Sequence, residues 1–518
     1  MRIRPGLSLA LHALASLGCS LGNVSVDRCR TDDACASAFG PGSTCDDGYC
    51  TAPTECSTTA KCREAFGFGA VCVEGRCATA PAEPRCNLSE PPELAGQFPT
   101  TVGDRILVGA LLKDTANQNA RATAMRHAVM EINGSGGING KPLGLLVCRN
   151  DATNTSSEND ETKRLVDYLG GDLGVPLILG PASSSNVTAA LSTVLDKKLA
   201  TTVISPSATA ASLTDQPIRF GDGKTTLFWR TCPKDTLQSR VLASEVAKET
   251  AGRLVIVYQN DPYGNGIQSA FVGELDSVAP HFKNGIELAT FRLDANLDAD
   301  LAKAADKVKG KDGAPVVFVA SDAAHTLKFF DALVKLGVTP PKIFLSDGSR
   351  SLVLLADTLS QPVRDLVKLS IGTGPAPFDK TDEGAAADYE SFRASMKSLY
   401  DVSITSFGFV SHSYDAAYVG AYGLIHAYTR GTGTVAGFDG FDVADGLKRL
   451  VGGTPVAVGQ NDFKTASNEL TGAKSIDVRG ISGPLEFDPN RGEAPGPIEI
   501  WRANATFDDF EQVSIVKP

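Results

Sequence analysis

The sequence is poor in the features that nucleic-acid-binding and membrane-spanning proteins need. It carries 49 Lys and Arg against 60 Asp and Glu, which gives an evenly spread formal net charge of −11. Because binding to phosphates needs clustered Lys and Arg, we expect no nucleic-acid partner. No uninterrupted apolar run is long enough to span a bilayer, which excludes a polytopic membrane protein. The hydrophobic content of 42% still suffices for large buried cores, so global disorder is excluded.

Motifs of the common enzyme classes are also missing. The chain has no H-E-x-x-H, G-x-S-x-G or Walker A segment. The run Gly134–Gly140 is not a dinucleotide-binding loop, because Asn139 replaces the last glycine and the run follows a helix rather than a strand. His412 and His426 are expected at opposite ends of one helix, too far apart to share a metal. We therefore expect no enzymatic activity, no cofactor and no metal site.

Cysteine is scarce in most of the chain and dense near its start. Of 12 cysteines, nine lie between Cys19 and Cys77 and one is Cys86, whereas only Cys148 and Cys232 follow. Dense cysteines in a short stretch indicate an oxidising compartment and a segment held by disulfides.

The first residues predict export. Two arginines precede a short apolar run at residues 7–17, which is the organisation of a secretory signal within residues 1–19. Gly18 directly before Cys19 resembles the lipobox of bacterial lipoproteins, although Ser16 stands where Leu is usual. The resemblance implies that Cys19 is lipidated and anchors the chain in the cell envelope, on the periplasmic face or at the outer membrane. The alternative is an ordinary cleaved signal in which Cys19 is incidental.

Eight cysteines form an internal repeat. The pattern C-x5-C-x9-C-x4-C occurs at residues 29–50 and again at 56–77, with an offset of 27 residues and ten identical positions among 22. Each copy is too small to form a stable core alone, so we expect two modules with two disulfides each, in any of three pairings. Zinc prefers closer cysteine pairs, and the aspartates that could bind calcium in the first copy are not repeated in the second. The candidate disulfide cysteines are Cys29, Cys35, Cys45, Cys50, Cys56, Cys62, Cys72 and Cys77.

A proline-rich stretch at residues 79–100 follows the repeats and predicts a semi-rigid linker. If Cys19 is lipidated or removed, an odd number of cysteines remains. Cys86, Cys148 and Cys232 therefore cannot all pair within the chain, and one of them is expected to be free or bonded elsewhere.

Apolar strands alternate with amphipathic helices from residue 105 onward. Residues 106–111 predict a buried strand, and residues 117–132 predict a helix with one apolar face. Such alternation indicates an α/β fold with parallel sheets and right-handed crossovers. Residues 101–518 are too many for one such sheet, so two Rossmann-like lobes are expected.

Seven short segments of this body resemble, in order, those of a known family. They are Glu131–Leu143, Gly180–Ser185, Ile204–Thr209, Phe228–Thr231, Asp261–Gly264, Tyr414–Ala416 and Gly483–Asp488. Their order and residue types are similar to the type I periplasmic binding proteins, and closest to the leucine/isoleucine/valine-binding branch, the substrate-binding proteins of ABC transporters.

This resemblance implies two similar lobes joined by three crossings, preceded by the small disulfide-rich segment. The first lobe would comprise residues 101–230 and 371–481, and the second would comprise residues 231–370 and 482–518. A ligand would bind in the cleft between them, where the carboxyl ends of parallel strands place loops and helix N-termini.

The resemblance also implies which residues of the first lobe hold the ligand. Ser184 corresponds to a serine that binds the ligand carboxylate, and its place at a predicted helix start favours an anion. Ser207, Ala208 and Thr209 correspond to a second wall of the site. The alternative for Ser184 and its neighbours is a plain helix N-cap, which serine favours without any ligand.

Three residues of the second lobe complete the expected site. Asp347 lies where the family places the acid for the ligand ammonium, Tyr263 corresponds to a cleft aromatic, and Asp322 stands where leucine binders have a tyrosine. A turn aspartate and a packing tyrosine are the alternatives for Asp347 and Tyr263. Because Asp347 is shorter than the usual Glu and Asp322 is polar, we expect a more polar pocket, open to polar amino acids, amides, short peptides or other small solutes.

Three functions fit these expectations. The first is a solute-binding lipoprotein that captures a small amino-acid-like or amide-like ligand by hinge closure and delivers it to the permease of an ABC transporter. The second is a sensor or scaffold that contacts another envelope protein through the Cys-rich modules. The third resembles outer-membrane lipoproteins of this fold that activate peptidoglycan synthases without a small ligand. The expected cleft residues favour a function that involves a small ligand. The Cys-rich modules favour a function beyond transport alone.

Overall fold

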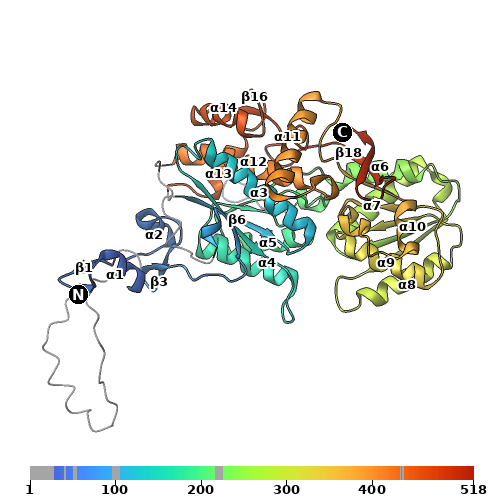
Figure 1. Ribbon diagram of the computed structural model, residues 1–518, viewed down its shortest axis with the longest axis horizontal. Coiled ribbons are helices and arrows are strands. Elements are labelled where there is room, and N and C mark those ends of the chain that lie inside the picture. Colours follow the sequence, from blue (N-terminus) through green and yellow to red (C-terminus); the bar gives the residue numbers. More distant parts are fainter. Residues whose placement is uncertain are drawn as a thin grey trace, which may run out of the picture.

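The computed structural model describes residues 29–39, 43–50, 55–95, 105–215, 226–431, 433 and 437–518. The predicted signal segment and Cys19 lie outside these residues. Within the described ranges, no helix combines the length and the apolar character needed to cross a membrane. Figure 1 shows two lobes side by side, with small N-terminal modules on the far side of the first lobe.

The first lobe is built around a six-stranded sheet. Its strands are β5 (Leu88–Glu90), β6 (Ile106–Leu112), β7 (Leu143–Arg149), β8 (Leu177–Leu179), β9 (Thr202–Ser205) and β10 (Phe228–Arg230). The strand order is β10-β9-β8-β6-β7-β5, and every neighbouring pair is parallel except β5 with β7. All of β6 is buried, as expected for a parallel strand covered on both faces. The helices of this lobe are α3 (Ala116–Gly134), α4 (Glu158–Val166), α5 (Ser184–Lys197), α11 (Glu383–Tyr400), α12 (Val410–Arg430), α13 (Gly440–Leu447) and α14 (Gln460–Thr471). A separate parallel pair, β16 (Thr454–Ala457) with β17 (Ile476–Arg479), lies beside them.

The second lobe is built around a seven-stranded sheet. Its strands are β11 (Leu254–Gln259), β12 (Ile286–Phe291), β13 (Val316–Val319), β14 (Ile343–Leu345), β15 (Ser370–Pro375), β18 (Ile498–Ala503) and β19 (Phe510–Val516). Their order is β12-β11-β13-β14-β15-β18-β19, in which the first five are parallel and the last two are added antiparallel. The helices are α6 (Asp235–Val246), α7 (Pro262–Val278), α8 (Leu297–Lys309), α9 (Ala323–Lys335) and α10 (Gln361–Leu369). The predicted α/β fold of two lobes is confirmed.

The chain crosses between the lobes after β10, after β15 and before β18, but two crossings lie further along the chain than expected. The first lobe was expected to resume at residue 371, yet residues 371–375 pair with β14 and β18 in the second sheet. The final crossing was expected at residue 482, yet Leu485 and Ala494 pack in the core of the first lobe. The order of motifs along a sequence does not specify which sheet a strand pairs with or which core an apolar side chain joins.

Buried charges tie the crossings together. Arg230 pairs with Glu493 at 2.7 Å, which joins the first crossing to the last. Asp415, in α12, accepts hydrogen bonds from the Ile481 N–H and from both the N–H and the hydroxyl of Ser482. Burial raises the pKa of Asp415 to about 6 despite these three donors. The family-like Tyr414–Ala416 segment thus has a structural role next to the last crossing.

Each Cys-rich repeat forms two disulfides of its own. The bonds join the first cysteine to the third and the second to the fourth, as Cys29–Cys45, Cys35–Cys50, Cys56–Cys72 and Cys62–Cys77. Each module has one short helix and one antiparallel ribbon. The first contains α1 (Asp32–Phe39), β1 (Cys45–Asp46) and β2 (Tyr49–Cys50), and the second contains α2 (Thr59–Phe66), β3 (Ala70–Val73) and β4 (Arg76–Thr79).

The second module packs directly on the first lobe. Phe68 and Val71 join the hydrophobic core of that lobe, and Arg63 donates a hydrogen bond to the Gly174 carbonyl. The positions 27 residues earlier in the first module hold Ala36, Pro41 and Thr44. The first module therefore lacks the side chains with which the second one docks.

A semi-rigid linker was expected at residues 79–100, but the described part of that range, residues 79–95, is bonded into the fold. A disulfide joins Cys86 to Cys148 in β7, and β5 pairs antiparallel with the same strand. Residues 81–90 are therefore part of the first lobe. The sequence did not predict this structure, because a strand of three residues is too short to show a periodic pattern and the disulfide partner lies far away in the chain.

Cys232 is the free cysteine of the described part of the chain, and it is fully buried. Burial raises the pKa of its thiol to about 12, which leaves almost no reactive thiolate. We predict that iodoacetamide leaves Cys232 unlabelled in the native protein and labels it in denaturant without any reductant. Mass spectrometry of the peptide that contains Cys232 measures this, and labelling of the native protein would contradict the buried position.

Candidate functional site

A polar cleft lies between the lobes, lined by residues of both. Four residues expected at the site, Ser184, Ser207, Tyr263 and Asp347, lie together on its walls. The structure adds lining residues that the sequence did not single out. These are Lys113, Gln118, Arg121, Glu158, Ala182, Ser183, Ser185 and Phe409 from the first lobe, and Gln259, Leu293, Ser321 and Gly348 from the second.

Three other expected residues lie beside the cleft rather than on its walls. Ala208 is fully buried, and its carbonyl accepts a hydrogen bond from Arg230 at 3.1 Å. Thr209 is 1% exposed, and its carbonyl accepts from the Asp235 N–H. Asp322 caps α9 by accepting from the Ala324 N–H at 2.9 Å. These positions hold the surrounding structure in place.

The N-terminus of α5 reaches the cleft because of a glycine before it. Gly180 has a φ of +89°, and a Cβ there would lie 2.5 Å from the Leu111 carbonyl oxygen, so only glycine fits this turn. Ser183 then caps α5 by accepting from the Asn186 N–H. Ser183 is thus the N-cap, whereas Ser184 is the first helical residue, and the free N–H groups and helix dipole beside them favour an anion.

A second turn presents Tyr263 to the cleft. A Cβ at Gly264 would lie 1.9 Å from the Gln259 carbonyl oxygen, which explains the glycine of the Asp261–Gly264 segment. Asp261 caps α7 by accepting from the Gly264 N–H at 2.9 Å. The Tyr263 hydroxyl then donates to Asp347 Oδ1 at 2.6 Å. Tyr263 therefore both lines the cleft and orients its acid.

Asp347 is the acid of the second lobe's wall. It lies just after β14 in a short 3-10 turn and is 6% exposed. Gln238 Nε2 donates to Asp347 Oδ1 at 3.0 Å, beside the Tyr263 hydroxyl. Burial raises the pKa of Asp347, whereas these two donors and Arg121 oppose the rise. Both side-chain hydrogen bonds reach Oδ1, so Oδ2 is the oxygen that a cationic group of a ligand can approach.

Arg121 is the buried cation of the first lobe's wall, which Lys113 also lines. It lies on α3 and is 6% exposed, and it donates to the Gly408 carbonyl at 3.0 Å and to Ser207 Oγ at 2.9 Å. Its guanidinium carbon lies 5.0 Å from the centre of the Phe409 ring. Burial lowers the pKa of Arg121 to about 10, so the side chain stays charged at neutral pH. Among the described residues, no carboxylate lies within ion-pair distance of Arg121.

The sequence carried one signal for Arg121. Arg121 is the charged residue among the inward positions of a helix that otherwise buries Gln118, His127 and apolar side chains, near the end of the first strand of a parallel sheet. The apolar face of this helix predicts the helix but does not point to Arg121. The cleft thus places a cation with no carboxylate in ion-pair contact on one lobe and an acid on the other, and the two charges attract each other across it.

His412 lies behind the cleft and should make stability depend on pH. It is 2% exposed on α12, and burial together with Arg121 lowers the pKa of His412 to about 3. Its unfolded pKa is near 6.5, so the unfolded chain binds more protons between these values and stability falls as the pH falls below about 6.5. We predict that His412→Gln loses less stability than the wild type between pH 7 and about pH 4. Urea unfolding at both pH values measures this, and equal losses would contradict the assignment.

Comparison with known proteins identifies the family. A family model described as "Periplasmic binding protein" matches residues 108–507, which include most of both lobes. The chain belongs to this family. A search among curated proteins found no match.

Solved structures share the fold. The branched-chain amino acid transporter substrate binding protein of Streptococcus pneumoniae, solved with isoleucine, is 20% identical, with 80% of this chain and 100% of that chain covered at a TM-score of 0.57. A leucine binding protein of Thermotoga maritima is 14% identical, with 80% and 99% covered at a TM-score of 0.58. A solute binding protein of R. palustris in complex with 4-hydroxybenzoate is 13% identical, with 80% and 97% covered at a TM-score of 0.58. At these identities the likeness shows the fold alone.

Proposed function

We propose that the chain is an extracytoplasmic solute-binding protein whose cleft captures a small ligand with a carboxylate at one end and a cationic group at the other. The observation that carries this proposal is the placement of Arg121 and Asp347, both buried, on opposite lobes of one cleft. A buried charge without a close partner of opposite sign is costly. A zwitterion that spans the cleft supplies that partner to each charge and holds the lobes together.

The ligand carboxylate would lie at Arg121 and the N-terminus of α5, which offers Ser184 and Ser185. Its ammonium would lie at Asp347 Oδ2. The isoleucine and 4-hydroxybenzoate bound to two proteins of this fold share only the carboxylate, which supports an anion-binding end. A guanidinium fork recognises a carboxylate with two parallel hydrogen bonds.

The middle of the ligand would be polar rather than branched aliphatic. Gln118 and Gln259 line the cleft together with Ser321, and Leu293 and Phe409 supply its apolar surface. Side-chain amides and hydroxyls in a cleft are best paired by a ligand that carries such groups itself. An amino acid with an amide or another polar side chain fits these walls.

The cellular role would be delivery of this ligand to the permease of an ABC transporter. Ligand would close the lobes about the three crossings, and the permease would recognise the closed form. The five disulfides of the described chain fit an oxidising compartment outside the cytoplasm. A lipid on Cys19 would anchor the protein in the cell envelope.

The second Cys-rich module favours one alternative, a ligand sensor or scaffold for another envelope protein. This module is docked on the ligand-binding lobe through Phe68 and Val71 rather than loosely tethered. A partner bound to the second module would therefore be held at a fixed position relative to the cleft. The same ligand would then regulate the partner instead of being transported.

A thermal-shift screen of the purified protein tests the proposal. The panel contains L-glutamine, L-asparagine, L-leucine, 4-hydroxybenzoate and uncharged glycerol as a control. A ligand at 100 times its Kd adds about 2.7 kcal/mol to stability, which gives a clear rise in melting temperature. We expect the polar amino acids to stabilise most and glycerol not at all. A flat response to every amino acid would count against the proposed ligand class.

A further inference from the structure

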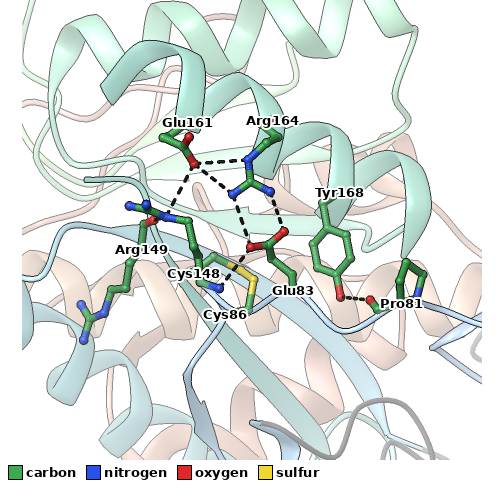
Figure 2. The surroundings of a disulfide bond; sticks show 9 residues. Pro81, Glu83, Cys86, Cys148, Arg149, Glu161, Arg164 and Tyr168 are labelled. Atoms are coloured by element: carbon green, nitrogen blue, oxygen red, sulfur yellow. Dashed lines mark hydrogen bonds and ion pairs between the residues drawn. A yellow bond between two sulfur atoms is a disulfide. The ribbon is translucent and has the colours of Figure 1, made fainter. Parts of the chain in front are cut away.

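Residues 81–90 form a bonded segment, here called the clasp, that holds the edge of the first lobe next to the modules. The Cys86–Cys148 disulfide and the pairing of β5 with β7 fix its centre. Figure 2 shows Glu83 facing Arg164 beside this disulfide, and the Tyr168 hydroxyl pointing to the Pro81 carbonyl. The clasp is thus anchored by a covalent bond, a strand and side-chain contacts.

Arg85 connects the clasp to the carboxyl end of β7. Its Nε donates to the Arg149 carbonyl at 2.6 Å and its Nη2 to the Asp151 carbonyl at 2.5 Å. The Arg149 N–H in turn donates to the Arg85 carbonyl at 2.9 Å. Glu161 lies 3.6 Å from Arg85 Nε and balances its charge. Three hydrogen bonds therefore hold the chain at the point where β7 becomes a loop.

That loop supports a wall of the cleft. Arg149 Nη1 donates to the Lys113 carbonyl at 3.0 Å, and the Asp151 carboxylate accepts from the Asp114 N–H at 2.9 Å. Lys113 donates through its N–H to Gln118 Oε1 at 2.7 Å and through Nζ to Glu158 at 3.1 Å. Lys113, Gln118 and Glu158 all line the cleft. An unbroken chain of hydrogen bonds thus runs from Arg85 to the ligand-facing side chains.

We propose that Arg85 is a positioning residue for ligand binding, which through Arg149 and Asp151 fixes the cleft wall formed by Lys113 and Gln118. The Cys86–Cys148 disulfide holds Arg85 at this position. The N-terminal segment is then a working part of the binding site as well as the connection to the Cys-rich modules. This inference rests on the proposed function, because it concerns affinity for a ligand in the interlobe cleft.

The network offers a matched control. Arg164 pairs with Glu83 and Glu161 in the same cluster, at 2.5 and 2.9 Å. Among the described contacts, it reaches neither Arg149 nor Asp151. Arg164→Gln therefore weakens the outer side of the clasp and spares the path to the cleft, whereas Arg85→Gln removes the two side-chain hydrogen bonds from Arg85 to the Arg149 and Asp151 carbonyls.

The test measures backbone hydrogen exchange and ligand affinity in the full chain. The variants are Arg85→Gln, Arg85→Lys, Arg164→Gln and the double variant Cys86→Ala/Cys148→Ala. Exchange is followed at residues 113–118 without ligand, and affinity is measured by calorimetry with L-glutamine, L-leucine and 4-hydroxybenzoate. We expect Arg85→Gln and the double variant to speed exchange at 113–118 and to raise Kd about 5- to 30-fold, as for lost hydrogen bonds of 1 to 2 kcal/mol. Arg85→Lys should show smaller increases in exchange rate and Kd than Arg85→Gln. Arg164→Gln should leave both the exchange rate and Kd unchanged.

The two readouts separate failure of this inference from failure of the proposed function. Unchanged exchange at 113–118 in Arg85→Gln overturns the inference, and so does unchanged affinity for a probe that the wild type binds. If the wild type binds none of the three probes, the proposed ligand class fails, and the exchange result alone then decides whether Arg85 positions the wall. If the double variant does not fold, the Arg85 variants still decide.

Discussion

Arg121→Gln should raise the Kd of any carboxylate ligand by about 100-fold. Arg121 is 6% exposed on the first lobe's wall, and none of the described carboxylates lies within ion-pair distance of it. A charge-assisted hydrogen bond to a buried carboxylate contributes about 1.5 to 3 kcal/mol, and a bidentate pair lies at the upper end of that range. Glutamine keeps a donor for Ser207 but loses both the charge and the fork. Calorimetry with the strongest ligand of the thermal-shift panel measures the change.

Two further variants show whether the loss comes from the cleft. Arg121→Lys keeps the charge without the fork, so its Kd should lie between those of the wild type and Arg121→Gln. Arg240→Gln removes an arginine that is exposed on α6, where it lies 3.8 Å from Glu274, and it should bind as the wild type does. A Kd for Arg121→Gln within about threefold of the wild type, with the fold intact, would exclude Arg121 as the carboxylate partner.

Asp347→Asn should distinguish zwitterions from simple acids. Asparagine keeps an oxygen for the Tyr263 hydroxyl and the Gln238 amide, so the second lobe's wall stays in place. It loses the charge that an ammonium needs. We expect the Kd of L-glutamine to rise about 100-fold, whereas that of 4-hydroxybenzoate, which has no cationic group, should stay the same or improve.

The matched control for this variant is Asp322→Asn. Asp322 caps α9 beside the cleft and its Oδ1 accepts from the Ala324 N–H, so asparagine, another good capping residue, should leave affinity within a few-fold of the wild type. An equal loss for L-glutamine and 4-hydroxybenzoate in Asp347→Asn would mean that Asp347 shapes the cleft without meeting an ammonium. A large loss in Asp322→Asn would mean that Asp322 reaches the ligand directly.

The sequence predicted the fold because many local patterns agree with it. The alternation of strands and helices predicted two lobes. The family-like segments Gly180–Ser185 and Asp261–Gly264 form turns whose glycines the structure explains by close backbone approaches. The sequence also placed Ser184 and Asp347 on the cleft correctly, because each follows the carboxyl end of a parallel strand.

The features that the sequence missed depend on contacts between distant parts of the chain. Arg121 meets Gly408 across 287 residues, and no pattern within α3 reveals that partner. The pairing of Cys86 with Cys148 and the short strand β5 turned an expected linker into part of the first lobe. The disulfide pairing within each repeat was open among three possibilities until the structure placed each helix against its ribbon.

Amide hydrogen exchange with and without the strongest ligand of the panel tests the central claim most directly, because it locates the bound ligand. The account predicts protection at residues 182–186 and 205–209 of the first lobe together with residues 259–264 and 346–349 of the second. A surface hollow near Gly136, Tyr428 and Lys464, on the first lobe alone, should show no change. Protection confined to one lobe, to that hollow or to the Cys-rich modules would contradict a ligand held between Arg121 and Asp347.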